Sequence, residues 1–171
     1  MSLATTGDLV APAASAGSAV LAFNVITIEH AEGVADGVEL AGVAAVLQIS
    51  ENTVRFHGGL GATSIMVGSA HLPYRDNVDR TRTFAKRAHA AGLWVEAELG
   101  EIGGKAGQKK DAHALGARTD PDEAEACAEE TGVDGLAVAV GNSHAMTTRD
   151  AHLDLELCRA VAAPLPERAA R

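Results

Sequence analysis

The stretch that decides the fold reads Leu93-Trp-Val-Glu-Ala-Glu-Leu-Gly-Glu-Ile-Gly-Gly104. Leu93 to Leu99 has the length and composition of a short buried strand, and the three glycines that follow predict a loop. Glu96 and Glu98 are two residues apart, so a regular strand points both carboxylates to one face. Carboxylates at strand ends are typical of sites in α/β proteins, although pairing with a Lys or Arg is the structural alternative. We therefore expect Glu98 to belong to a functional site.

Short apolar strands alternate with amphipathic helices along the rest of the chain, which predicts parallel βαβ units. The other expected strands are Val20–Val25, Ala44–Ile49, Ser64–Val67 and Gly135–Val140, and the expected helices are Glu29–Leu40, Asn77–Ala91, the segment from Thr119 to Gly132 and Leu153–Ala163.

These elements predict an α/β fold of the (β/α) TIM-barrel type, but an incomplete one. About five of eight strand–helix units are present, and a closed barrel usually needs ~200 residues or more. We expect a single partial barrel domain over residues 1–163, a mobile loop at 103–117 and a disordered tail at 164–171.

Composition restricts the partners and the compartment. The net charge of −9 argues against nucleic acid and against anionic membrane surfaces, so any phosphate site must be local. Cys127 and Cys158 lack the spacing of a disulfide framework and are expected to be reduced thiols. No Lys or Arg precedes Arg55 and no apolar run could span a membrane, so we predict no secretory signal and a cytoplasmic protein.

Polar residues at or just after the predicted strand ends are the candidate site residues: Asn24, Ser50, Glu98 and His144. Other histidines fit structural roles better. His57 is expected on the helix or loop after the second strand, His71 in a Pro-containing turn, and His113 in the solvated loop, where a lid over a phosphate is the alternative.

A series of short blocks occurs in the order found in one enzyme family, from Phe23 to about Ala163. The chain resembles the zinc-dependent class II fructose- or tagatose-bisphosphate aldolases. The matching blocks are Ala22-Phe-Asn-Val25, Leu47-Gln-Ile-Ser50, Ser64-Ile-Met-Val67, His71-Leu-Pro-Tyr74, Val95-Glu-Ala-Glu-Leu-Gly100, Gly103-Gly104, Thr119-Asp-Pro121, Thr131-Gly-Val-Asp134, Leu136-Ala-Val-Ala-Val-Gly141 and His144.

The resemblance implies a chemistry and a set of roles. Family members use Zn²⁺ as a Lewis acid to cleave a ketose 1,6-bisphosphate reversibly into dihydroxyacetone phosphate and glyceraldehyde 3-phosphate. His144 matches the second zinc histidine, and Glu98 matches a carboxylate that holds the metal in an alternative position. Asn24, Ser50 and Ala145 match the substrate site, with Ala145 replacing the usual Gly.

Parts of the family pattern are missing. The Leu-His-Leu-Asp-His block, with the first zinc histidine and the catalytic Asp, is absent between Ser50 and Ser64, and so are the C-terminal blocks with the third histidine. Gly68 stands where an Asp serves the alternative metal position. We therefore assign no catalytic residue.

Other interpretations remain open for a shortened chain. The protein could be an inactive remnant, or a binding or assembly subunit that completes its barrel with another chain. An unrelated metal-dependent β/α enzyme is a further alternative. Because a partial barrel exposes sheet edges, we also expect self-association as a homo-oligomer.

Overall fold

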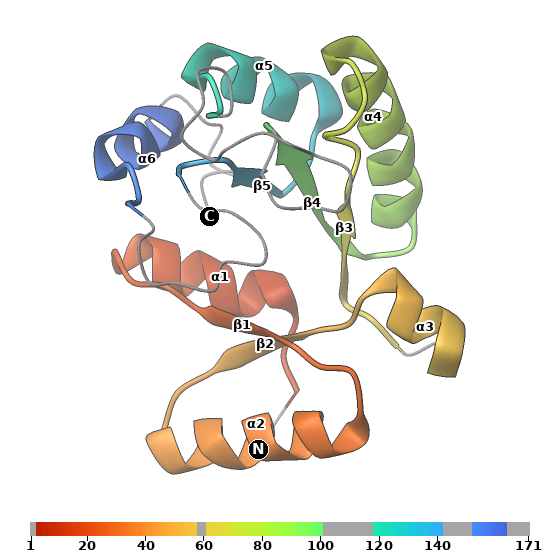
Figure 1. Cartoon of the computed structure of the whole chain (residues 1–171), viewed down its shortest axis with the longest axis vertical. Coiled ribbons are helices and arrows are strands. Elements are labelled where there is room, and N and C mark those ends of the chain that lie inside the picture. Colours follow the sequence, from red (N-terminus) through yellow and green to blue (C-terminus); the bar gives the residue numbers. More distant parts are fainter. Residues whose placement is uncertain (1–2, 58–60, 101–117, 142–151, 164–171) are drawn as a thin grey trace. The chain divides into compact units, whose positions relative to one another are not determined.

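A computed structural model describes residues 3–57, 61–100, 118–141 and 152–163 (Figure 1). A helix precedes the first strand, and after it strands and helices alternate. The helices are α1 (Thr6–Ser15), α2 (Ile28–Ala41), α3 (Glu51–His57), α4 (Tyr74–Ala90), α5 (Pro121–Thr131) and α6 (Leu155–Ala162). The strands are β1 (Leu21–Asn24), β2 (Ala45–Gln48), β3 (Ser64–Val67), β4 (Trp94–Leu99) and β5 (Gly135–Val138).

The chain divides into two compact units, the first ending at Ser64 and the second beginning at Ile65. In the first unit, β1 and β2 form a parallel pair, with Leu21 opposite Ala45 and Asn24 opposite Gln48. The helix between them, α2, begins where the Thr27 side chain accepts a hydrogen bond from the His30 N–H and ends at Gly42, which has φ +64°. Neither β1 nor α2 contains a buried residue, so this unit has little core of its own.

The second unit contains the sheet β3-β4-β5 and most of the buried core. Strand β4 is central and runs parallel to β5. Alternate β4 residues, Val95, Ala97 and Leu99, are at most 5% exposed and belong to clusters with apolar side chains of the neighbouring helices. In Figure 1, α4 and α5 lie side by side, and α4 contacts β4 while α5 contacts β5. The opposite face of β4 is therefore left to Glu96 and Glu98.

The predicted order of elements is confirmed. All five strands are present, and each is followed by a helix. The boundaries agree within a few residues, although β5 ends at Val138 rather than at Val140. In the described ranges the strands form two separate sheets and no closed barrel.

Two helices go beyond the prediction: α3, whose segment is expected only as a helix or loop, and α1. The segment Thr6–Ser15 forms α1, which begins at a capping box: the Thr5 hydroxyl accepts from the Asp8 N–H, and the Asp8 carboxylate accepts from the Thr5 N–H. Its small apolar residues gave no clear helical period, and Pro12 lies inside it.

The predicted loop at 103–117 and tail at 164–171 lie outside the described residues, and a single domain over 1–163 stays a prediction. None of the described helices is long and apolar enough to cross a membrane.

Candidate functional site

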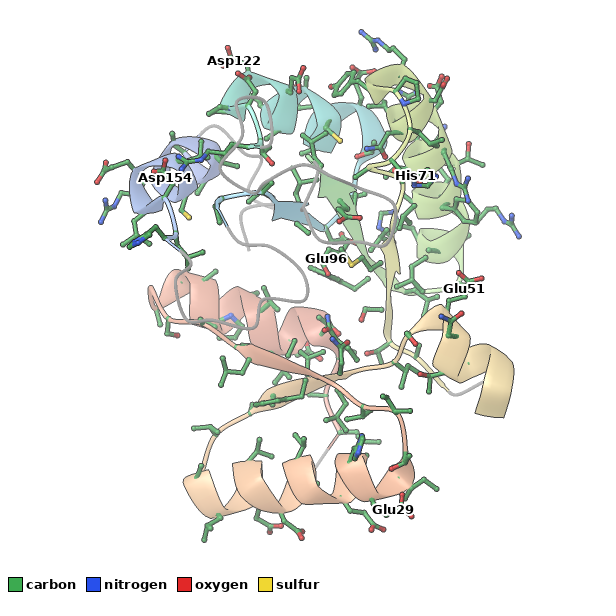
Figure 2. All side chains as sticks on the ribbon, viewed as in Figure 1. Glu29, Glu51, His71, Glu96, Asp122 and Asp154 are labelled. Carbon is green, nitrogen blue, oxygen red and sulfur yellow. The ribbon has the colours of Figure 1, made fainter. Side chains whose placement is uncertain are left out.

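Two carboxylates project from the same face of β4 near its carboxyl end. Glu98 is 4% exposed, and Glu96 is partly buried. Figure 2 shows Glu96 projecting from the strand away from α5. Burial raises the pKa of Glu96 above its usual range, and the negative charge of Glu98 raises it further. The two side chains are thus close enough to interact electrostatically, as their spacing in the sequence predicts.

The neighbouring strand leaves room for these carboxylates. Gly68 follows β3, and a Cβ atom added to it would lie 3.7 Å from the Glu98 Oε2. Gly68, the position that the resemblance pairs with an Asp, therefore lies beside Glu98. An aspartate at this position would bring a third carboxylate to the pair, whereas glycine adds none.

The backbone that carries Glu98 is held from the helix side. The Asn77 Nδ2 donates to the Glu98 carbonyl oxygen at 3.1 Å, and the Thr81 Oγ1 donates to the Asn77 Oδ1 at 3.0 Å. Asn77 and Thr81 belong to α4 and are at most 3% exposed. Hydrogen bonds in such a buried network resist competition from water, so they keep this carbonyl in one orientation.

A second buried side chain joins the carboxyl ends of β4 and β5. The Thr119 Oγ1 donates to the Leu99 carbonyl oxygen at 2.8 Å and accepts from the Ala139 N–H at 2.8 Å. The Thr119 N–H also donates to the Ala139 carbonyl oxygen at 3.1 Å. Gly100 has φ +89°, and a Cβ on it would lie only 2.7 Å from the Thr119 Oγ1. The glycine after β4 therefore permits this bridge.

The candidate residues of the first unit have simpler surroundings. Asn24 is exposed at the end of β1. The Ser50 Oγ accepts from the Thr53 N–H at 3.1 Å and shares a hydrogen bond with the Thr53 Oγ1 at 2.9 Å. Ser50 thus caps the start of α3, a structural role that does not require a ligand.

Several predicted residues fall outside the described ranges. These are His144, Ala145 and His113. His71 lies exposed in the turn before α4, and His57 lies at the end of α3. The described ranges contain no group of three His, Cys, Asp or Glu side chains that could hold a metal ion.

Sequence reasoning identified the carboxylates but missed the residues that support them. Asn77 was assigned only to a helix, and Thr119 only to a helix start. Asp120 does cap α5, by accepting from the N–H groups of Asp122 and Glu123. A threonine before such a cap carries no further signal in one sequence, because its contacts are to backbone atoms distant along the chain.

The carboxylates of Glu96 and Glu98 could together contribute ligands to a divalent cation. Glu96 and Glu98 place two carboxylates close together with restricted access to water, and carboxylate oxygens are donors to divalent cations. As oxygen donors they fit part of a metal site. A stable zinc site needs three or four protein ligands, so the described residues fit only as a portion of one.

Comparison with known proteins gives a family match. Residues 58–166 match the family model for fructose-bisphosphate aldolase class-II. A fructose-bisphosphate aldolase of Giardia intestinalis is 40% identical over 98 residues, which are 57% of this chain and 29% of that protein. The chain thus spans well under two thirds of this relative's length.

Solved structures share the fold. A putative fructose-1,6-biphosphate aldolase from Coccidioides immitis matches with a TM-score of 0.81 and 22% identity, over 96% of this chain and 70% of that chain. The YdjI aldolase from Escherichia coli K12 matches with a TM-score of 0.78 and 24% identity over the same shares. The predicted α/β fold, an incomplete barrel of strand–helix units, is confirmed.

Proposed function

The chain belongs to the class-II fructose-bisphosphate aldolase family, and on this premise we propose that it serves zinc-dependent, reversible cleavage of a ketose 1,6-bisphosphate. The substrates would be fructose or tagatose 1,6-bisphosphate, and the products dihydroxyacetone phosphate and glyceraldehyde 3-phosphate. The observation that carries the proposal is the buried Glu98 carboxylate, which lies beside Glu96 and Gly68 in the segment that matches the family.

Glu98 and His144 are the residues that would hold zinc. When bound, the metal would supply Lewis-acid polarisation of the substrate carbonyl. Glu98 suits this role because its backbone is held by Asn77 and its side chain is shielded from water. Glu96 would add negative charge close to the cation, which favours binding.

The proposed substrate site contains three residues. Asn24, Ser50 and Ala145 would line the sugar bisphosphate, and for Ser50 this requires a hydroxyl that also caps α3. The net charge of −9 gives no general attraction for phosphate groups, so these would be bound by local donors. No described residue is assigned as the proton carrier.

Association of copies is part of the same proposal. Leu21, Phe23 and Leu47 on the β1–β2 pair are 39% to 64% exposed, and burying such side chains between copies would stabilise a homo-oligomer. Light scattering of the purified chain measures this directly. We also propose a cytoplasmic location, where triose phosphates and reduced thiols coexist.

The test combines zinc binding with a coupled cleavage assay on both bisphosphates. Glu98→Gln removes the negative charge with little change of shape, and Glu129→Gln is the matched control at an exposed position of α5. We expect the wild-type chain and Glu129→Gln to bind zinc and turn over substrate, and Glu98→Gln to lose both. A folded wild-type chain with neither zinc binding nor turnover would overturn the proposal and leave the inactive remnant or assembly subunit.

A further inference from the structure

We propose that Thr119 is a positioning residue that locks the carboxyl ends of β4 and β5 together and thereby sets where the Glu98 side chain lies. The link to metal binding rests on the proposed function, whereas the link to the position of Glu98 does not. Thr119 is separated from Glu98 by 21 positions, so this role could come only from the tertiary structure.

The first argument is the number of buried partners at Thr119. Its side chain and its N–H together make three hydrogen bonds, all to backbone groups of the two strand ends. The residue is 3% exposed, so water cannot easily replace a lost partner. A single side chain thus connects Leu99 on β4 with Ala139 just after β5.

The second argument is that the carbonyl groups of Glu98 and Leu99 each accept a hydrogen bond from a different side chain. Asn77 of α4 binds the Glu98 carbonyl oxygen, and Thr119 binds the Leu99 carbonyl oxygen. Peptide planes are rigid, so holding these two carbonyls fixes the backbone on the carboxyl side of Glu98. The Cα–Cβ direction of Glu98 follows from that backbone.

The third argument is the glycine beside the bridge. Gly100 has a left-handed φ, and any Cβ there would approach the Thr119 Oγ1 to 2.7 Å. The close approach of the hydroxyl to the β4 end therefore depends on both residues. Gly100 leaves room for the Thr119 hydroxyl, and that hydroxyl connects the end of β4, from which Glu98 projects, to the residue after β5.

Three variants test whether the Thr119 hydroxyl positions Glu98 or only stabilises the fold. Thr119→Val keeps the shape and removes the hydroxyl, and Thr119→Ser keeps the hydroxyl. Thr131→Val is the matched control, because Thr131 is also buried and its hydroxyl donates to the Cys127 carbonyl oxygen at 2.6 Å within α5. If Thr119→Val does not fold, Thr119→Cys, of similar size and with only a weak donor, takes its place.

The primary readout needs no metal. A Cβ added to Gly68 would lie 3.7 Å from the Glu98 Oε2, so we expect the folded wild-type chain to show a nuclear Overhauser effect between the Gly68 Hα and Glu98 Hγ protons. We expect Thr119→Val to weaken this signal, and Thr119→Ser and Thr131→Val to retain it. The second readout is zinc affinity, which should fall about tenfold or more in Thr119→Val and return to the wild-type value in Thr119→Ser.

The outcomes are distinct. If Thr119→Val keeps the wild-type Gly68–Glu98 signal while losing as much stability as Thr131→Val, Thr119 only stabilises the fold and the proposal is wrong. If the wild-type chain binds no zinc, the proposed function fails, and the proton signal alone decides the role of Thr119.

Discussion

Cys127 shows what burial does to a single titratable side chain. It is 1% exposed in a cluster with side chains of α4, β4 and α6, and burial, with the charge of Glu130 as a smaller cause, raises the pKa of its thiol from 9.0 to about 11. Between these values the folded protein keeps a proton that the unfolded chain has lost. The free energy of unfolding therefore falls as the pH rises from 9 towards 11, by up to about 1.4 kcal/mol per pH unit from this group.

Cys127→Ala should remove that contribution. We expect the variant to be less stable than the wild type at pH 8, because a buried sulfur atom is lost, and to show a shallower decline of stability between pH 9 and 11. Denaturant titrations at several pH values measure the slope. Parallel slopes for the two proteins would contradict the assignment to Cys127.

For single residues, the sequence predicted that Glu98 shares a strand face with Glu96, but it did not predict which residues surround Glu98. The spacing of Glu96 and Glu98 is enough to place both carboxylates on one face, because a strand has a period of two. The depth of burial and the raised pKa of Glu96 depend on what covers that face. Ser50 shows the converse: its hydroxyl caps α3, a local role that the polar strand-end pattern did not reveal.

Among the elements, α2 has one glycine inside it and another directly after it, and replacing them should have opposite effects. Gly37 lies inside the helix with open space around the position of an added Cβ, whereas Gly42 ends the helix with φ +64°. Gly37→Ala should stabilise the helix by about 0.5–1 kcal/mol, because alanine loses less conformational freedom on folding. Gly42→Ala should destabilise it by about 1 kcal/mol, because alanine is strained in the left-handed region.

Circular dichroism during denaturant titration measures both effects on helical signal. The two substitutions add the same methyl group to the same helix, so their difference isolates the backbone conformation. Equal effects of the two alanines would contradict the assigned end of α2.

Element types were predictable where the pattern was strong and local. The five strands and the helices α2, α4, α5 and α6 follow from apolar periodicity and from end signals such as Gly132, which ends α5 with φ +69°. The helix α1 escaped notice because small apolar residues give a weak period. Its capping box at Thr5 and Asp8 was the signal available.

For the whole molecule, core burial is unevenly divided between the two units. Val25 is the buried hydrophobic residue of the first unit in the described ranges, and the others lie beyond Ile65. Hydrogen exchange should therefore be slowest for the amides of β4 and β5, and faster for those of β1 and α2, because local opening there exposes less apolar surface. Mass spectrometry of the full chain after timed exchange measures this. Equal protection of β1 and β4 would show that the first unit is stabilised by contacts beyond its own core.

The sequence by itself determined the order of strands and helices, the family and the face on which Glu96 and Glu98 lie. These depend on local periodicity and on ordered motifs, which a single chain carries in its residues. Only the tertiary structure decided that Asn77 holds the Glu98 carbonyl group and that Thr119 joins two strand ends. These contacts link positions about 20 residues apart, and backbone partners of this kind leave no pattern in side-chain identity.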